Sequence, residues 1–361
     1  MTESLIDWDF ALATAVRMTR PGPEVDSAEA AEVVAELREG AALSEGPVRE
    51  FTGLAASSAS APVLVVDRRG WIAANLASFE VVLAPMLAKA SKAAADRGQT
   101  PGRIGRSVGS RVTGAELGAA LAFLSTKVLG QFDPFHSAPA AAPGGLDVGG
   151  RLLLVAPNVV HVERELDVEP HDFRLWVCLH EETHRVQFTA VPWMRAHIQG
   201  LIDQLVDATD MDPEGVSRSL GEMSKAAGRF VKGEKVSLMD VLQNDQQREV
   251  VAQVTGVMSL LEGHADVVMD GVGPSVIPSV KQIRKRFDKR RSGGGFVDRL
   301  IRQVLGLDAK MRQYRDGAAF VRTVERKVGR EGFDAVWAAP ENLPSAEEIE
   351  KPDLWVARVH G

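Results

Sequence analysis

Two histidines lie four residues apart in the segment His180-Glu181-Glu182-Thr183-His184. On a helix such residues lie one turn apart on the same face, so both imidazoles can reach one metal ion, and zinc accepts this arrangement. Glu181 would then lie beside the open coordination position, where a carboxylate can take a proton from an attacking water. The alternative is a helix whose two histidines are satisfied at the surface or in the core, and the amphipathic helix around them favours the metal.

The third ligand decides the kind of metal site. A catalytic zinc site uses three protein ligands and leaves one position to water, whereas a structural site uses four protein ligands. A metzincin would carry Gly and His three and six residues after His184, and this chain has Gln187 and Ala190 there, which excludes that class.

A later segment, 260–266, is rich in candidate ligands. Glu262 and Asp266 share one face of a helix, so Glu262 could bind zinc while Asp266 accepts the free ring N–H of a ligand histidine. His264 lies about 200° around a regular helix from Glu262, so it could also ligate only if the helix breaks at Gly263. Otherwise His264 could contact substrate or be a histidine on the helix surface.

Three further features could belong to the site. Tyr314, the only tyrosine, could stabilise the oxyanion formed on an attacked carbonyl, or it could be an ordinary half-buried ring. The segment Leu129–Phe135 could line a cleft, although a turn that ends a helix is the favoured interpretation. The apolar run Arg151–Ala156, stopped by Pro157, predicts a strand that is either an edge strand pairing with a peptide or a buried interior strand.

These candidates need helices to position them. Asp172 begins a segment in which Phe173, Trp176, His180, His184 and Gln187 follow each other at helical spacing, and this helix should end before Pro192. Val63–Val66 is too short to separate strand from helix. Further helices are predicted at Leu5–Met18, Ser27–Glu39, Trp71–Ala94, Thr113–Leu129, Trp193–Asp207, Pro213–Val231, Leu238–Gln247 and Glu249–Met269. A surface loop is predicted at 137–150, and a joint after the basic segment at Ser292–Gly295.

Composition narrows the function classes. Hydrophobic residues at 45% and charged residues at 25% are ordinary for a globular protein, so the chain is neither disordered nor fibrous. A net charge of −7 argues against nucleic acid as the main partner, and the basic segment Lys281–Arg291 is interpreted as a solvated helix end. Cys178 is the only cysteine, so any metal must rely on histidines and carboxylates. Without a signal peptide or a run of about 18 to 20 apolar residues, we expect a cytoplasmic protein with no membrane role.

Four stretches together resemble a known family: WVCLHEETHRVQFTAVPW, LGQFDPF upstream of it, EGHAD downstream and QYRDGAAFV near the end. They are similar to an uncharacterised bacterial family of zincin-like metallohydrolases, often linked to biosynthesis of a deazaflavin cofactor. The resemblance implies a bound Zn²⁺ at the HExxH helix. It also supports Glu262 as third ligand, because EGHAD is similar to the E-x-x-x-D helix of gluzincins. Glu182 and Arg185 depart from the usual uncharged positions and could pair on the outer face of the helix.

The resulting expectation is a mainly α (α+β) fold, with a zincin-like metalloprotease core, a small β-sheet and many additional helices. Residues 1–100 would form an N-terminal helical region, 101–275 the catalytic core and 276–361 a C-terminal helical subdomain. The predicted function is a zinc-dependent hydrolase, a metallopeptidase acting on a peptide or other amide, with Glu181 as general base. The alternative is a binding or scaffold protein that keeps the fold without hydrolysis, against which the intact Glu181 argues. The oligomeric state is left open.

Overall fold

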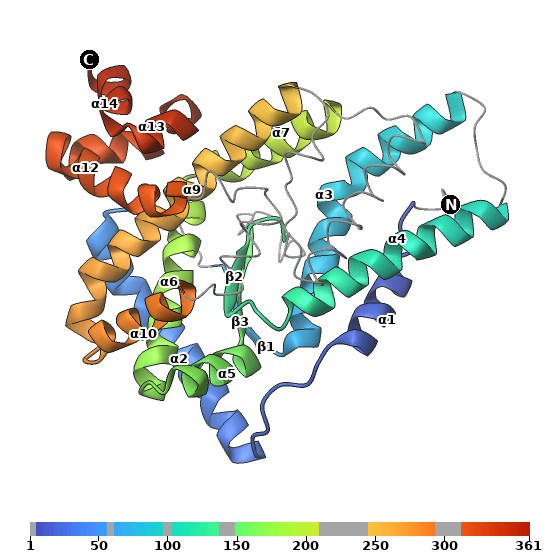
Figure 1. Cartoon of the computed structure of the whole chain (residues 1–361), viewed down its shortest axis with the longest axis horizontal. Coiled ribbons are helices and arrows are strands. Elements are labelled where there is room, and N and C mark those ends of the chain that lie inside the picture. Colours follow the sequence, from blue (N-terminus) through green and yellow to red (C-terminus); the bar gives the residue numbers. More distant parts are fainter. Residues whose placement is uncertain (1–4, 56–60, 97–102, 137–148, 209–244, 293–311) are drawn as a thin grey trace, which may run out of the picture.

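A three-stranded sheet lies at the centre of the described chain (Figure 1). The structure is a computed structural model that describes residues 5–55, 61–96, 103–136, 149–208, 245–292 and 312–361. Strand β3 (Arg151–Val155) lies between β1 (Val63–Val66), to which it is parallel, and β2 (Gly130–Asp133), to which it is antiparallel. The run Arg151–Ala156 is therefore an interior strand, and the prediction that Leu129–Phe135 only ends a helix was wrong.

One face of the sheet is covered by α1 (Trp8–Met18), α3 (Arg68–Asp96) and α4 (Arg103–Leu124). Their apolar residues form a cluster with Leu153 and Val155 of β3. Leu154, which points the other way because strand side chains alternate, belongs to a different cluster. The central strand thus contributes to the core on both faces, as its uninterrupted apolar sequence predicts.

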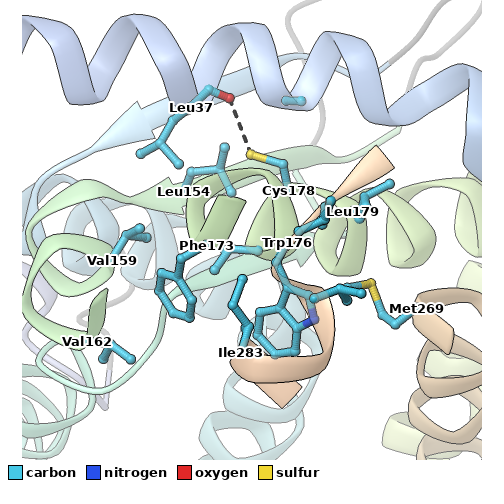
Figure 2. Close-up of a cluster of buried hydrophobic side chains, with 14 of the residues drawn as sticks. Leu37, Leu154, Val159, Val162, Phe173, Trp176, Cys178, Leu179, Met269 and Ile283 are labelled. Carbon is cyan, nitrogen blue, oxygen red and sulfur yellow. Dashed lines mark hydrogen bonds between the residues drawn. The ribbon is translucent and has the colours of Figure 1, made fainter. Parts of the chain in front are cut away.

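The second cluster contains the helix that carries the histidine motif. It joins α2 (Ser27–Thr52), α5 (Ala156–Leu166), α6 (Pro170–Ala190), α9 (Asp245–Val276) and α10 (Val280–Ser292). Figure 2 shows Phe173 and Trp176 of α6 within this cluster, with Ile283 and Met269 beside them. On the side of α6 toward α2, the Sγ atom of Cys178 donates to the carbonyl oxygen of Leu37 at 3.5 Å. Cys178 is fully buried, and burial raises the pKa of its thiol, as is typical of an unreactive core cysteine.

A third cluster joins the C-terminal elements to the core. These elements are α12 (Arg312–Asp334), η2 (Ala335–Trp337), η3 (Pro340–Asn342), α13 (Ala346–Glu350) and α14 (Pro352–His360). Their apolar residues pack with those of α9, and Met194 of α7 (Met194–Asp207) belongs to the same cluster. The proposed division at residues 100 and 275 stays a prediction.

The helices confirm the mainly α prediction, with differences at their ends. Helix α2 is capped by Asp26, which accepts from the backbone N–H groups of Ala28 and Glu29, and it continues to Thr52. It was predicted to end near Gly40, but Gly40 lies inside it, where a Cβ would be 3.1 Å from the Sγ atom of Cys178. The predicted helix at 213–231, residues 238–244 of the helix predicted at 238–247, and most of the predicted loop and joint lie outside the described residues. The described end of the 238–247 prediction belongs to α9, which runs without a break from Asp245 to Val276.

Helix α3 contains, from Arg68 to Lys92, a segment long and apolar enough to cross a membrane. The expectation that the chain has no apolar segment long enough to span a bilayer was therefore wrong. Length and composition are weak evidence for a membrane span, because the core helix of a globular protein passes the same test. Here Trp71, Ile72 and Leu76 of this helix are buried in the cluster beside β3. The absence of a membrane role stays a prediction.

Candidate metal centre

Helix α6 carries two of the three candidate ligands. It begins at Pro170, and Glu169 caps it by accepting from the backbone N–H of Asp172 at 2.7 Å. Proline suits the first turn because its missing N–H would have no helical partner there. The buried stripe of Phe173 and Trp176 fixes the rotation of the helix about its axis. His180 and His184 continue that stripe and so face α9.

Glu262 of α9 completes the group. Its Oε2 lies 3.7 Å from Nε2 of His180, and its Oε1 lies 3.7 Å from Nε2 of His184. The two Nε2 atoms are 3.3 Å apart, and one ligand atom from each residue falls within 4.8 Å of the others. Bonds of about 2.0–2.2 Å to a tetrahedral zinc ion would place ligand atoms roughly 3.4 Å apart. The three side chains therefore fit a metal ion with three protein ligands.

Glu181 lies next to these ligands and is almost completely buried, with 7% of its surface exposed. Burial raises the pKa of Glu181 to about 7; the nearby His184 lowers it and the Glu262 carboxylate raises it further. A carboxylate with a pKa near neutrality is suited to both accepting and releasing a proton. The structure thus places Glu181 beside the candidate ligands, and its role as general base stays a prediction.

Strand β2 lies directly against Glu181. A Cβ at Gly130 would be 2.5 Å from Cγ and 2.7 Å from Cδ of Glu181, so only glycine fits there without a shift. The strand is anchored at its other end, where Asp133 accepts from Arg151 at 3.0 Å and from Ser78 at 2.6 Å. In the described part of the chain β2 is an edge strand. The segment Leu129–Phe135 therefore borders the centre, the interpretation that the sequence favoured less.

Gln187 has a role at this centre that sequence reasoning did not assign. Its Oε1 lies 2.9 Å from Nδ1 of His184, and its Nε2 donates to the carbonyl oxygen of Leu261 at 3.0 Å. The same Nε2 is 3.0 Å from Nδ1 of His264. The helical stripe through His180 and His184 includes Gln187, and that position was the only signal available in the sequence.

His264 lies on α9 within hydrogen-bond distance of Gln187, and it is buried. Its ring packs against those of Phe333, at 5.7 Å between centroids, and Trp337, at 5.1 Å. Burial lowers the pKa of His264 to about 3, and the charge of Arg330 adds to this effect, as does that of His184. Only 5% of the surface of His264 is exposed, so the alternative of a histidine on the helix surface was wrong. A direct contact of His264 with substrate stays a prediction.

The roles predicted for Asp266 and Tyr314 stay predictions. Asp266 lies one turn beyond Glu262 and pairs with Arg284 at 3.3 Å, while the partner of the Nδ1 atom of His184 is Gln187. Tyr314 lies in the first turn of α12, and its side chain is outside the described part of the structure.

Glu182 and Arg185 do form a pair, but the expected location on the outer face was wrong. Arg185 donates from Nε and Nη2 to the two carboxylate oxygens of Glu182, both at 2.7 Å. Neither side chain faces solvent, because α2 covers them: Arg185 also donates to Glu45 at 2.9 Å, and to the carbonyl oxygen of Ala61 at 3.1 Å. This pair fastens the motif helix to its neighbour.

Two histidines one helical turn apart, a glutamate from a second helix and a buried glutamate beside the first histidine define a zincin-like site. The family described as zincin-like metallopeptidase matches residues 6–356, and the chain belongs to this family.

The whole chain is also similar to a solved structure. This is the crystal structure of a protein from Chloroflexus aurantiacus proposed to be a hydrolase with a novel fold. The two sequences are 29% identical over 98% of each chain, and the structures superpose with a TM-score of 0.69. No curated protein matches the chain. The link to a deazaflavin cofactor stays a prediction.

Proposed function

We propose that this protein is a zinc-dependent hydrolase that cleaves peptide or other amide bonds, with Glu181 as general base. The convergence of His180, His184 and Glu262 within 4.8 Å, beside a buried Glu181, carries this proposal. Membership of the metallopeptidase family supports an amide substrate, and the similarity to a proposed hydrolase agrees with it. The choice of zinc follows from the ligand set, because two imidazoles and a carboxylate are frequent ligands of catalytic zinc.

The residues of the chain divide the chemistry between them. His180, His184 and Glu262 would hold the zinc ion, which when bound would supply Lewis acidity at the scissile carbonyl and lower the pKa of the attacking water. Glu181 accepts the proton that this water loses, and then gives it to the leaving amine. Burial of Glu181 raises the pKa of its carboxyl group, which favours uptake of the proton.

Strand β2 offers a way to hold the substrate. An extended peptide can add to the edge of a sheet through main-chain hydrogen bonds. The contact between Gly130 and Glu181 means that a chain paired along β2 would pass close to the general base. Pairing of this kind recognises backbone and so favours peptides over other amides.

Glu181→Gln tests the proposal. The amide is nearly the same size as the carboxylate but cannot accept the proton, so turnover should fall by roughly 10²–10⁴-fold, while bound zinc, measured by elemental analysis, should stay equal to wild type. The assay is digestion of a peptide library by zinc-loaded protein, followed by mass spectrometry. Glu50→Gln, an exposed substitution in α2, is the matched control and should cleave normally.

Two outcomes would contradict the proposal in different ways. Normal cleavage by the Glu181→Gln variant would remove Glu181 from the mechanism. Zinc-loaded wild-type protein that cleaves nothing would instead favour the alternative of a zincin-fold binding or scaffold protein.

A further inference from the structure

We propose that Gln187 determines which ring nitrogen of His184 carries the proton, and that Leu261 and His264 hold Gln187 in the orientation needed. The inference rests on the proposed function only in taking Nε2 of His184 as the atom that faces the metal. Gln187 would then be a positioning residue that acts through His184.

The orientation of the Gln187 amide follows from whether each neighbouring atom can donate or accept a hydrogen bond. The carbonyl oxygen of Leu261 can only accept a hydrogen bond, and it lies 3.0 Å from one end of the amide. That end must therefore be the NH₂ group. The oxygen end is then the one 2.9 Å from Nδ1 of His184, so this assignment comes from the chemistry of the partners.

The proton on His184 follows in turn. An amide oxygen can only accept, so Nδ1 of His184 must carry hydrogen. In the neutral ring Nε2 is then unprotonated, and its lone pair is available toward Nε2 of His180, 3.3 Å away, and Oε1 of Glu262, 3.7 Å away. A ligand imidazole must present an unprotonated nitrogen to a metal ion, and a hydrogen bond to its other nitrogen selects that form. His184 is therefore prepared for binding before any ion arrives.

His264 closes the arrangement. The second amide hydrogen of Gln187 points to Nδ1 of His264, 3.0 Å away, and this ring is held by Phe333 and Trp337. Gln187 itself is completely buried. Rotating its amide by half a turn would place the amide oxygen against the carbonyl oxygen of Leu261, and two acceptors in contact repel each other.

A neutral amide also has an electrostatic consequence. Ligand histidines are often oriented by a carboxylate, which adds a negative charge to the surroundings of the metal. Glu262 and Glu181 already supply two carboxylates here. Gln187 selects the ring form without adding a third.

The experiment reads the ring form directly, in metal-free protein. Long-range ¹H–¹⁵N spectra of histidine-labelled protein distinguish the two neutral forms, at about pH 8, where an ordinary histidine is neutral. Wild-type His184 should be in the Nδ1–H form, and Gln187→Met, which keeps the length of the side chain but not the acceptor, should shift it to the Nε2–H form. Zinc affinity, measured by competition with a chelator, should fall roughly 10–100-fold in this variant.

Two further variants make the result specific. His264→Phe keeps a ring between Phe333 and Trp337 but removes the acceptor, and it should lower zinc affinity less than Gln187→Met does. Asn158→Leu removes a different buried amide, which donates to the carbonyl oxygens of Ser125 and Val128. It should lower stability while leaving the His184 spectrum and the zinc affinity unchanged.

The outcomes separate this inference from the proposed function. An Nε2–H form in wild-type His184 would overturn the inference even if Gln187→Met failed to fold. The inference would also fail if Gln187→Met bound zinc as tightly as wild type while His184→Ala lost it, although the metal site would stand. If wild type bound no zinc but showed the Nδ1–H form, the proposed function would fail and the inference would hold.

Discussion

Two sides of helix α6 carry buried polar side chains, but the two groups are built differently. On the side toward α2, the Arg185 guanidinium donates to Glu182, to Glu45 and to a backbone carbonyl. On the side toward α9, His180, His184 and Glu262 bring three metal-binding groups to within 3.3–3.7 Å of each other. In the first group, the charged side chains are satisfied by hydrogen bonds to each other and to a backbone carbonyl. In the second group, the three side chains surround a point that suits a cation.

The difference separates two uses of buried charge on one helix. The pair of Glu182 and Arg185 joins α6 to α2, so loss of one partner leaves the other charge uncompensated in a buried place. On the ligand side, the Glu262 side chain is about one third exposed, and the geometry of the three side chains suits the binding of an ion. Disrupting the first should therefore cost stability, and disrupting the second should cost metal affinity.

The largest effect on stability is expected for Arg185→Met. Glu182 is 0% exposed and would lose the two hydrogen bonds that its carboxylate accepts from Arg185. Breaking a buried pair in this way costs about 3–5 kcal/mol in the free energy of unfolding. Denaturant unfolding of the metal-free protein measures it, and zinc bound per folded molecule should not change.

The double variant Glu182→Met/Arg185→Met tests the reason for that loss. Replacing both charges with apolar side chains of similar length is often neutral. The double variant should therefore recover most of the stability lost in Arg185→Met. A double variant as unstable as the single one would show that the contacts of Arg185 with α2, and not the stranded Glu182 charge, dominate.

A smaller effect is expected for Gly130→Ala on the ligand side. The new Cβ would overlap Cγ and Cδ of Glu181, and overpacking of this kind costs roughly 1–3 kcal/mol. Displacing a general base by about 1 Å can lower turnover by about 10²-fold. We expect weak cleavage of a peptide library with zinc retained.

Gly109→Ala is the matched control for this prediction. It makes the same substitution in α4, where nothing lies within 4 Å of the added Cβ, so stability should stay equal or rise and cleavage should be normal. Full activity in Gly130→Ala would contradict the proposal that the contact between β2 and Glu181 positions a general base.

The parts of the site that the sequence predicted are those determined by spacing along a single helix. His180 and His184 share one face because they are four residues apart, and apolar neighbours at the same spacing indicated that this face is buried. Glu262 was found because its segment places it on one side of a second helix. Helical spacing does not determine that the two helices meet with these three side chains facing each other. That expectation came from the candidate ligands in the segment 260–266 and was supported by the family resemblance.

What the sequence could not predict depends on contacts between distant segments. Gln187 has a role only because Leu261 and His264 lie 74 and 77 residues further along the chain. Arg185 was predicted to lie on the outer face of its helix, but it is buried. Glu45, 140 residues earlier in the chain, lies on a helix that covers it. Strand β2, which begins with glycine, has little strand signal of its own, and its pairing with β3 defines it.

The smallest effect on the metal-free protein is expected for Glu262→Gln. Partly exposed pairs contribute about 0–1 kcal/mol, so unfolding without metal should hardly change. Zinc should separate the two proteins, because an ion bound only by the folded state adds about 2.7 kcal/mol at a hundredfold excess over Kd. Wild type should gain this stability on titration with zinc, as should Glu249→Gln, an exposed control on the same helix, whereas Glu262→Gln should gain little at the same concentrations. An equal gain in Glu262→Gln would show that the glutamate is not a ligand. The contrast between the two sides of α6 would then rest on the histidines alone.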